Sequence, residues 1–121
     1  MKKNNLNKTL KKCIILLNSK YKLEIIFYLS VKKMRFGEIK ENIETITQQL
    51  LTKLLREMEK DNLIIREELK YFPRRVDYSL TAFGKSTKPI INSLCKWEKN
   101  NLKIINKLIK ENFLNSVYDY Y

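Results

Sequence analysis

The polar side chains between positions 48 and 56 are of the types that read DNA. They are Gln48, Gln49, Thr52, Lys53 and Arg56. Glutamine, threonine, lysine and arginine can hydrogen-bond base edges in a major groove or the phosphate oxygens beside it. No acid precedes Glu57 in this stretch, although a surface helix usually carries acids in its first turn. A solvated helix face would explain the same residues, but the missing acids favour a polyanionic partner.

A helix within residues 43–60 must position these side chains. At about 100° per residue, its apolar residues gather in one arc of roughly 140°, wide enough to anchor a helix in a core. These are Leu50, Leu51, Leu54, Leu55 and Met58. Thr47 is the predicted N-cap, because its hydroxyl can accept a hydrogen bond from a free amide of the first turn. The same free amides favour anions, so Thr47 is also a candidate phosphate contact.

The residues before this helix predict a partner for it. Ser19 can cap a helix over residues 20–31, which is rich in apolar positions. A turn and a short extended piece at 34–36 follow, and then a short helix at 37–42. Two short helices joined by a few residues, the second with a polar outer face, form a helix-turn-helix.

Two strands are predicted after the polar helix, at residues 63–68 and 75–80, the second alternating at period two. Pro73 in the connection favours a hairpin tip there. The basic residues of this tip are Lys70, Arg74 and Arg75, with Tyr71 and Phe72 between them. A solvated turn would look similar, but a basic hairpin after a helix-turn-helix is typical of a wing that contacts phosphates or the minor groove.

Apolar patterns at both chain ends predict further helices. Residues 1–22 hold seven lysines and no acid, and Leu6, Leu10, Cys13 and Leu17 fall on one helical face. That helix could dock on its own core or lie on a membrane, but its wide stripe favours burial against protein, including a second subunit. Thr81 caps a further short helix, and Pro89 restarts it. From there to about residue 112, apolar positions cover more than half the circumference, which indicates a subunit interface.

Composition sets limits on the function. The formal charge of +12 favours nucleic acid or an anionic membrane surface as partner. The chain has no histidine, only two glycines, and two cysteines without metal-ligand spacing, which argues against His-based catalysis, a glycine-rich phosphate loop and most transition-metal sites. Its longest apolar run, residues 13–17, is too short for a membrane span or a signal peptide. We expect a cytoplasmic non-enzyme without cofactor or metal.

Five segments of the chain, from about Ser19 to Glu98, resemble the HxlR-type winged-helix transcriptional regulators, relatives of the MarR family. The segments are Lys20-Tyr21-Lys22-Leu23, Arg35-Phe36-Gly37-Glu38-Ile39, Ile46 to Thr52 with Leu55 to Glu59, Pro73 to Thr81, and Leu94-Cys95-Lys96-Trp97. Each is weak alone, but the five in order at the expected spacing are a strong match. The resemblance implies a homodimer that reads DNA through the helix after Thr47.

Two positions depart from the family pattern. Tyr21 stands where the family usually has tryptophan, a change that the core can absorb. Several members sense oxidants through a cysteine at positions that hold Asn7 and Lys8 here, so that role does not carry over to Cys13, one to two helical turns later. Cys13 is nevertheless the candidate redox residue, although its apolar stripe and the setting of Cys95 favour structural, packed thiols.

Together these patterns predict a mainly α fold with a small β-hairpin wing, in one domain over residues 1–121. Residues 34–80 would form the helix-turn-helix and wing, and residues 1–18 and 89–114 the dimerisation helices. The expected function is sequence-specific regulation of transcription by a homodimer on an inverted repeat of double-stranded DNA. A winged helix used only for protein interaction is the alternative. A small molecule or an oxidant could act as effector.

Overall fold

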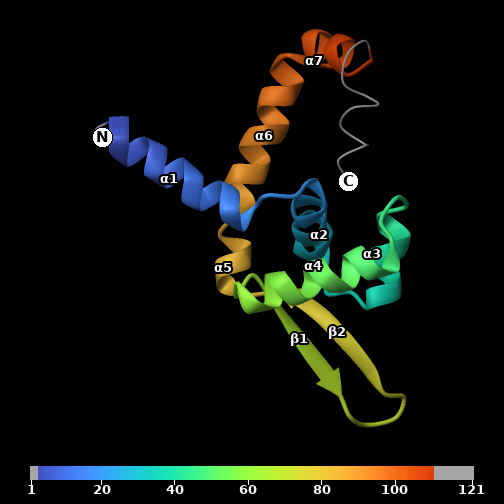
Figure 1. Ribbon diagram of the computed structural model, residues 1–121. Coiled ribbons are helices and arrows are strands. Elements are labelled where there is room, and N and C mark those ends of the chain that lie inside the picture. The colour runs from blue at the N-terminus through green and yellow to red at the C-terminus, as the bar shows by residue number, and fades with distance from the viewer. Residues whose placement is uncertain (1–2, 111–121) are drawn as a thin grey trace. The chain divides into compact units, whose positions relative to one another are not determined.

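The computed structural model describes residues 3–110, and the side chains of residues 5–110. These residues fall into two compact units, divided between Lys88 and Pro89. The first unit holds α1 (Lys3–Leu16), α2 (Lys20–Val31), α3 (Phe36–Asn42), α4 (Gln48–Lys60), β1 (Ile64–Leu69), β2 (Arg75–Leu80) and α5 (Ala82–Lys85). From Lys88 onward the chain forms α6 (Lys88–Asn100) and α7 (Leu102–Leu108). The mainly α fold with one hairpin is confirmed (Figure 1).

Helix α2 supplies the centre of the core and begins where its cap predicts. The Ser19 hydroxyl accepts a hydrogen bond from the Tyr21 amide at 3.2 Å. Tyr21 is buried, and its phenol oxygen lies 2.9 Å from the hydroxyl of Thr45, within hydrogen-bond distance. A buried tyrosine needs such a partner, so the core accommodates this residue as predicted. Further core members are Ile25, Ile26, Leu29, Ile39, Ile43, Leu51, Leu55, Met58 and Leu63.

Helices α3 and α4 form the predicted helix-turn-helix. Helix α3 begins at Phe36, one residue before the predicted start. Thr47 caps α4, its hydroxyl accepting from the Leu50 amide at 3.1 Å. At the other end of α4, Asn62 has a φ of 61°, and the Leu63 amide donates to the Met58 carbonyl at 2.9 Å. This is a Schellman-type stop, which satisfies carbonyls that the helix end leaves open.

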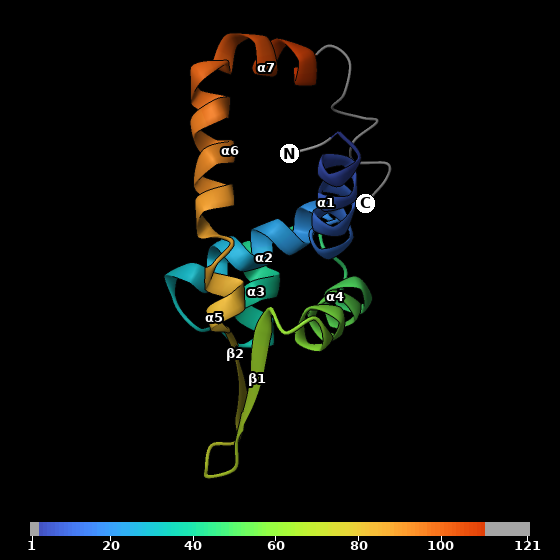
Figure 2. The same ribbon diagram turned by 90° about the vertical axis from the view of Figure 1, so that its left-hand side faces the viewer.

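The wing is an antiparallel hairpin whose register runs from Ile64 opposite Leu80 to Leu69 opposite Arg75. Its first strand begins one residue later than predicted. Strand β2 also pairs with the chain just before α3, where Met34 and Tyr78 exchange two backbone hydrogen bonds of 3.0 and 2.8 Å. Figures 1 and 2 show the hairpin projecting away from α2, α3 and α4. The root of the wing is therefore tied to the helix-turn-helix, and its tip is not.

Helix α5 fastens the end of β2 to the start of β1. The Thr81 hydroxyl donates to the Asn62 carbonyl at 2.6 Å and accepts from the Gly84 amide at 2.8 Å. A Cβ atom at Gly84 would lie 2.1 Å from the carbonyl oxygen of Leu63. Only glycine fits such a close approach of two backbones.

The last predicted helix is interrupted, which corrects the expectation of one continuous helix after Pro89. Helix α6 ends at Asn100, and Asn101 leaves the helical conformation with φ −129° and ψ 27°. Its side-chain amide donates to the Trp97 carbonyl at 2.9 Å. Asparagine side chains compete for backbone groups in this way and weaken helices. Residues 111–114 of the predicted dimerisation segment lie outside the described residues.

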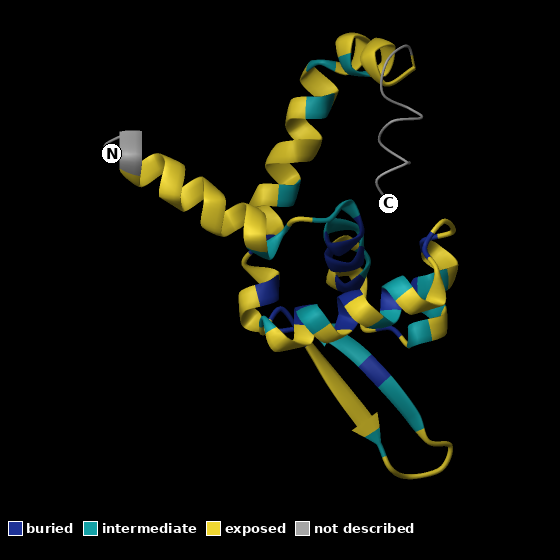
Figure 3. Ribbon diagram, in the orientation of Figure 1, coloured by how far each residue is buried: buried dark blue, intermediate teal, exposed yellow. Residues whose placement is uncertain are grey.

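Many apolar residues of α1, α6 and α7 are exposed, and Figure 3 colours most of these helices yellow, as exposed. The residues involved include Leu6, Leu10, Ile14, Ile90, Leu94, Trp97, Leu102, Ile104 and Leu108. Both Cys13 and Cys95 are exposed as well. The two thiols are therefore not packed within the single chain, and their packing in a subunit interface stays a prediction. None of the described helices is long and apolar enough to cross a membrane.

Candidate nucleic-acid interface

Helix α4 presents most of its predicted DNA-reading side chains to solvent. Its apolar arc packs into the core, and Gln48, Gln49, Lys53 and Arg56 are exposed on the other side. Thr52 is half-buried, and its hydroxyl donates to the Gln48 carbonyl at 2.9 Å. That hydroxyl keeps lone pairs with which it can accept a hydrogen bond. The N-cap Thr47 is exposed at the start of the same face.

The first acid of α4, Glu57, is engaged with the core. Glu57 Oε2 lies 3.1 Å from the ammonium nitrogen of Lys22, a side chain only 3 % exposed. The ion pair joins α2 to α4 and neutralises a carboxylate that would otherwise repel phosphates. Lys22 was not among the predicted functional residues, since a sequence does not show which lysine is buried.

The basic residues of the wing fall into two groups. Lys70 and Arg74 are exposed at the tip. Arg75 is half-buried, and its Nε atom lies 3.5 Å from Oδ2 of the buried Asp77, which also faces the Lys33 ammonium at 3.9 Å. Arg75 thus neutralises a buried carboxylate on its own strand, and Lys70 and Arg74 are the better placed for an outside partner.

A pocket of about 390 Å³ lies between α4, the start of α3 and the wing. It is lined by Phe36, Thr52, Leu55, Arg56, Glu59, Arg66 and Tyr78. Two predicted DNA contacts, Thr52 and Arg56, share this pocket with Arg66 of β1. Sequence reasoning missed Arg66, because it stands beside two glutamates in the strand and pairs with Glu68 at 3.8 Å. Its position brings a second guanidinium to the pocket, beside that of Arg56.

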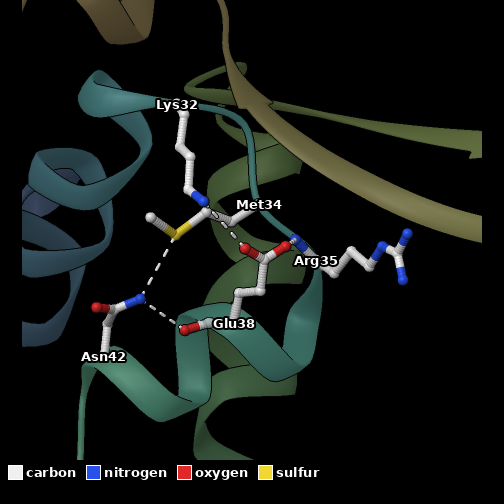
Figure 4. Close-up of polar contacts among 5 residues, drawn as sticks. All are labelled: Lys32, Met34, Arg35, Glu38 and Asn42. Atoms are coloured by element: carbon white, nitrogen blue, oxygen red, sulfur yellow. Dashed lines mark hydrogen bonds and ion pairs between the residues drawn. The ribbon is translucent and has the colours of Figure 1, made fainter.

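The start of α3 is held by a small polar cluster (Figure 4). Glu38 accepts a hydrogen bond from the Arg35 amide at 3.2 Å and pairs with the Lys32 ammonium at 3.4 Å. The Arg35 amide, assisted by Lys32, lowers the pKa of the Glu38 carboxyl below its ordinary value. Asn42 donates to the Glu38 carbonyl at 2.8 Å and to the Met34 sulfur at 3.8 Å. Figure 4 shows the Arg35 guanidinium pointing away from the cluster, at the beginning of the helix-turn-helix.

The residues that the structure describes contain no group of three or more side chains suited to hold a metal ion. Glu59 of α4 is an exposed acid, but most exposed polar side chains on α4, the wing tip and the start of α3 are amides, hydroxyls, ammonium groups and guanidinium groups. Such groups bind base edges and phosphate oxygens.

Comparisons with known proteins agree with this geometry. The model of the HxlR-like helix-turn-helix family matches residues 16–106. An HTH-type transcriptional regulator of Methanothermobacter thermautotrophicus is 45 % identical over 83 residues, which cover 69 % of this chain and 63 % of the relative. The HTH-type transcriptional regulator YdzF of Bacillus subtilis is 40 % identical over 83 residues, 68 % of this chain and 76 % of YdzF.

Among solved structures, the redox regulator HypR in its reduced form superposes with a TM-score of 0.76 at 30 % identity. The match covers 82 % of this chain and 98 % of HypR. A likeness of this extent shows that the two proteins share a fold. The chain belongs to the HxlR-like helix-turn-helix family of winged-helix transcriptional regulators.

Proposed function

We propose that this protein is a sequence-specific DNA-binding regulator that acts as a homodimer on an inverted repeat, in the cytoplasm. The observation that carries the proposal is the division of α4 into a buried apolar arc and an exposed face of amides and cations. Helix α4 would lie in the major groove, where such side chains distinguish base pairs. The wing would lie alongside, over the backbone and the adjacent minor groove.

Individual side chains take different roles in this arrangement. Gln48 and Gln49 would contact base edges, since an amide can pair with adenine through two hydrogen bonds. Thr52 would accept from a base or lie against a thymine methyl group. Thr47, at the helix N-terminus, would hold a phosphate among free backbone amides.

The cations would set the position of the protein on the duplex. Lys53 and Arg56 could contact either a base or a phosphate, and Lys70 and Arg74 would contact phosphates from the wing. Arg75 was predicted to join them, but its contact with Asp77 makes it the weakest member of the set. We add Arg66, which shares the pocket with Arg56, and Arg35, which lies at the start of α3.

The exposed apolar faces support the dimer. On α6, Ile90, Leu94 and Trp97 recur at helical spacing, and each is nearly half or more exposed, with Trp97 at 61 %. Helix α1 carries a second such stripe through Leu6, Leu10 and Ile14. Contiguous apolar surface of this kind marks interaction sites. A second copy is the simplest occupant, because two α4 helices related by a two-fold axis fit half-sites about 34–36 Å apart.

The experiment is selection of duplexes from a random pool, followed by affinity measurements at several salt concentrations. We expect an inverted repeat. Gln49→Ala should relax the preference at particular bases by about 1–3 kcal/mol. Arg74→Ala should weaken all duplexes alike and lower the salt slope by about one. Glu67→Gln, an exposed change on β1, is the control. Equal affinity for selected and random duplexes without salt dependence would favour the protein-interaction module instead.

A further inference from the structure

The wing tip carries two aromatic side chains that the fold does not use. Phe72 is 95 % exposed and Tyr71 is 69 % exposed. The apolar residues that hold the hairpin, Ile64 and Leu80, are buried at its root instead. Figure 3 colours the ribbon of the tip as exposed, at the end of the hairpin farthest from α2, α3 and α4. A large apolar ring kept in water at the end of a projecting hairpin gains nothing in the free protein, so its use lies in a complex.

The charges around the ring indicate the kind of surface that it meets. Lys70 and Arg74 flank the aromatic pair and are exposed, and no acid stands between Leu69 and Arg75. An apolar tip framed by cations is complementary to a groove with anionic edges and apolar side walls. The minor groove of DNA has this character, with phosphates at its edges and sugars and stacked bases within.

We propose that Phe72 is an apolar wedge that enters the minor groove and opens a base step next to the bases contacted by α4. The inference rests on the proposed DNA-binding function and adds a second source of sequence preference to it. Pyrimidine–purine steps such as TA and CA/TG unstack most easily. The operator should therefore hold a pyrimidine–purine step where Phe72 enters the groove. The preference for that step would come from its ease of unstacking and would need no hydrogen bond to the bases.

The test uses the selected duplex with 2-aminopurine placed in turn at each position flanking the α4 contacts, since this base fluoresces more strongly when it is unstacked. Binding of the wild-type protein should raise the fluorescence severalfold at one flanking step in each half-site. Phe72→Ala should abolish that rise and weaken binding about tenfold with an unchanged salt slope. Phe72→Leu, which keeps an apolar wedge, should retain most of the rise.

Two controls separate the wedge from other causes. Arg74→Ala should lower the salt slope but keep the fluorescence rise once the duplex is saturated. The thermal melting curve of Phe72→Ala should match that of the wild type, because the side chain makes so little contact with the fold.

The outcomes are distinguishable. If the wild type binds its selected duplex and no flanking position brightens, the wedge is overturned and the proposed function stands. If Phe72→Ala binds and brightens the duplex as the wild type does, the wedge is likewise overturned, and the tip is assigned to a protein partner. If the wild type binds no duplex with preference, the proposed function and the wedge fall together.

Discussion

At the scale of single residues, Lys22 has the least exposed charged side chain among the described residues, and it joins α2 to α4. Lys22 is 3 % exposed, and its ammonium has the Glu57 carboxylate 3.1 Å away. A buried ammonium without a counter-charge is costly, whereas a pair replaced as a whole can be nearly neutral. Glu57 is 41 % exposed, so solvent screens the pair and reduces its net worth.

Glu57→Gln should therefore lower the free energy of unfolding by about 1–3 kcal/mol, because it leaves the Lys22 ammonium buried without its carboxylate. Lys22→Met with Glu57→Gln should recover part of that loss. Glu59→Gln, an exposed change two residues away, should stay within about 0.5 kcal/mol of the wild type. Urea unfolding of the four proteins measures these values. A Glu57→Gln variant as stable as the Glu59→Gln control would show that the pair contributes nothing.

A second residue-scale prediction concerns acid. The Arg35 amide and the Lys32 ammonium lower the pKa of Glu38 in the folded state. A group whose pKa is lowered by folding stabilises the protein above its unfolded pKa, and that contribution is lost as the pH falls through the folded value. The stability difference between wild type and Glu38→Gln should be constant near neutral pH and should shrink as the pH falls from above the ordinary pKa of a glutamate to below it. Unfolding measured across that range, with Glu41→Gln as control, tests it. A difference that does not change with pH would contradict the assignment.

At the scale of elements, the start of a helix was predictable where an N-cap side chain accepts a hydrogen bond from a nearby backbone amide. Ser19, Thr47 and Thr81 each accept a backbone hydrogen bond from two or three residues ahead, and each helix begins right after its cap. The break at Asn101 was not predictable from periodicity, because apolar positions continue on both sides of it. Contacts between distant residues were also out of reach, which is why the buried Lys22 was missed. Arg66 and Arg75 were misjudged because the sequence does not show which cation pairs with an acid two residues away, as Arg66 does with Glu68 and Arg75 with Asp77.

The two glycines, Gly84 and Gly37, offer a matched test of the close contact between α5 and the residue before β1. Gly84→Ala would place its Cβ 2.1 Å from the Leu63 carbonyl oxygen, so α5 or the start of β1 must shift. We expect a loss of about 2–3 kcal/mol in unfolding free energy. Gly37→Ala meets no atom within 4 Å in helix α3 and should gain about 0.5–1 kcal/mol. Thermal or urea unfolding decides it, and equal effects of the two substitutions would refute the packing argument.

At the scale of the whole molecule, the apolar faces of α1, α6 and α7 predict assembly. Leu102→Asp would place a charge in the proposed interface, where an unpaired buried charge costs several kcal/mol. Sedimentation at micromolar concentration should show a dimer for the wild type and a monomer for the variant. Lys103→Asp, a neighbouring charge change outside the apolar stripe, is the control. A wild type that sediments as a monomer would end the two-fold model.

The thiol of Cys13 gives an independent report on the same assembly. It lies on the stripe of Leu6 and Leu10 and is exposed in the single chain. Assembly through α1 should cover it and slow its reaction with a thiol reagent, and the Leu102→Asp variant should restore fast reaction.

The same thiol allows a test for oxidant sensing. We expect diamide to leave the DNA affinity of the dimer unchanged. A loss of affinity after diamide that Cys13→Ser lacks would instead identify Cys13 as an oxidant sensor.

The wing can finally be regarded as a cantilever. Its root is clamped by the backbone exchange between Met34 and Tyr78 and by the contact of the Thr81 amide with the Leu63 carbonyl at 3.1 Å. Beyond Tyr78 the hairpin is held by its own ladder and, at Asp77, by the ion pair with Lys33 at 3.9 Å. A beam fixed at one end deflects most at its free end and hardly at its root. In the proposed complex, bending at the tip would let the wing follow grooves of different width, and the clamp would keep that strain away from the angle at which α4 meets the DNA.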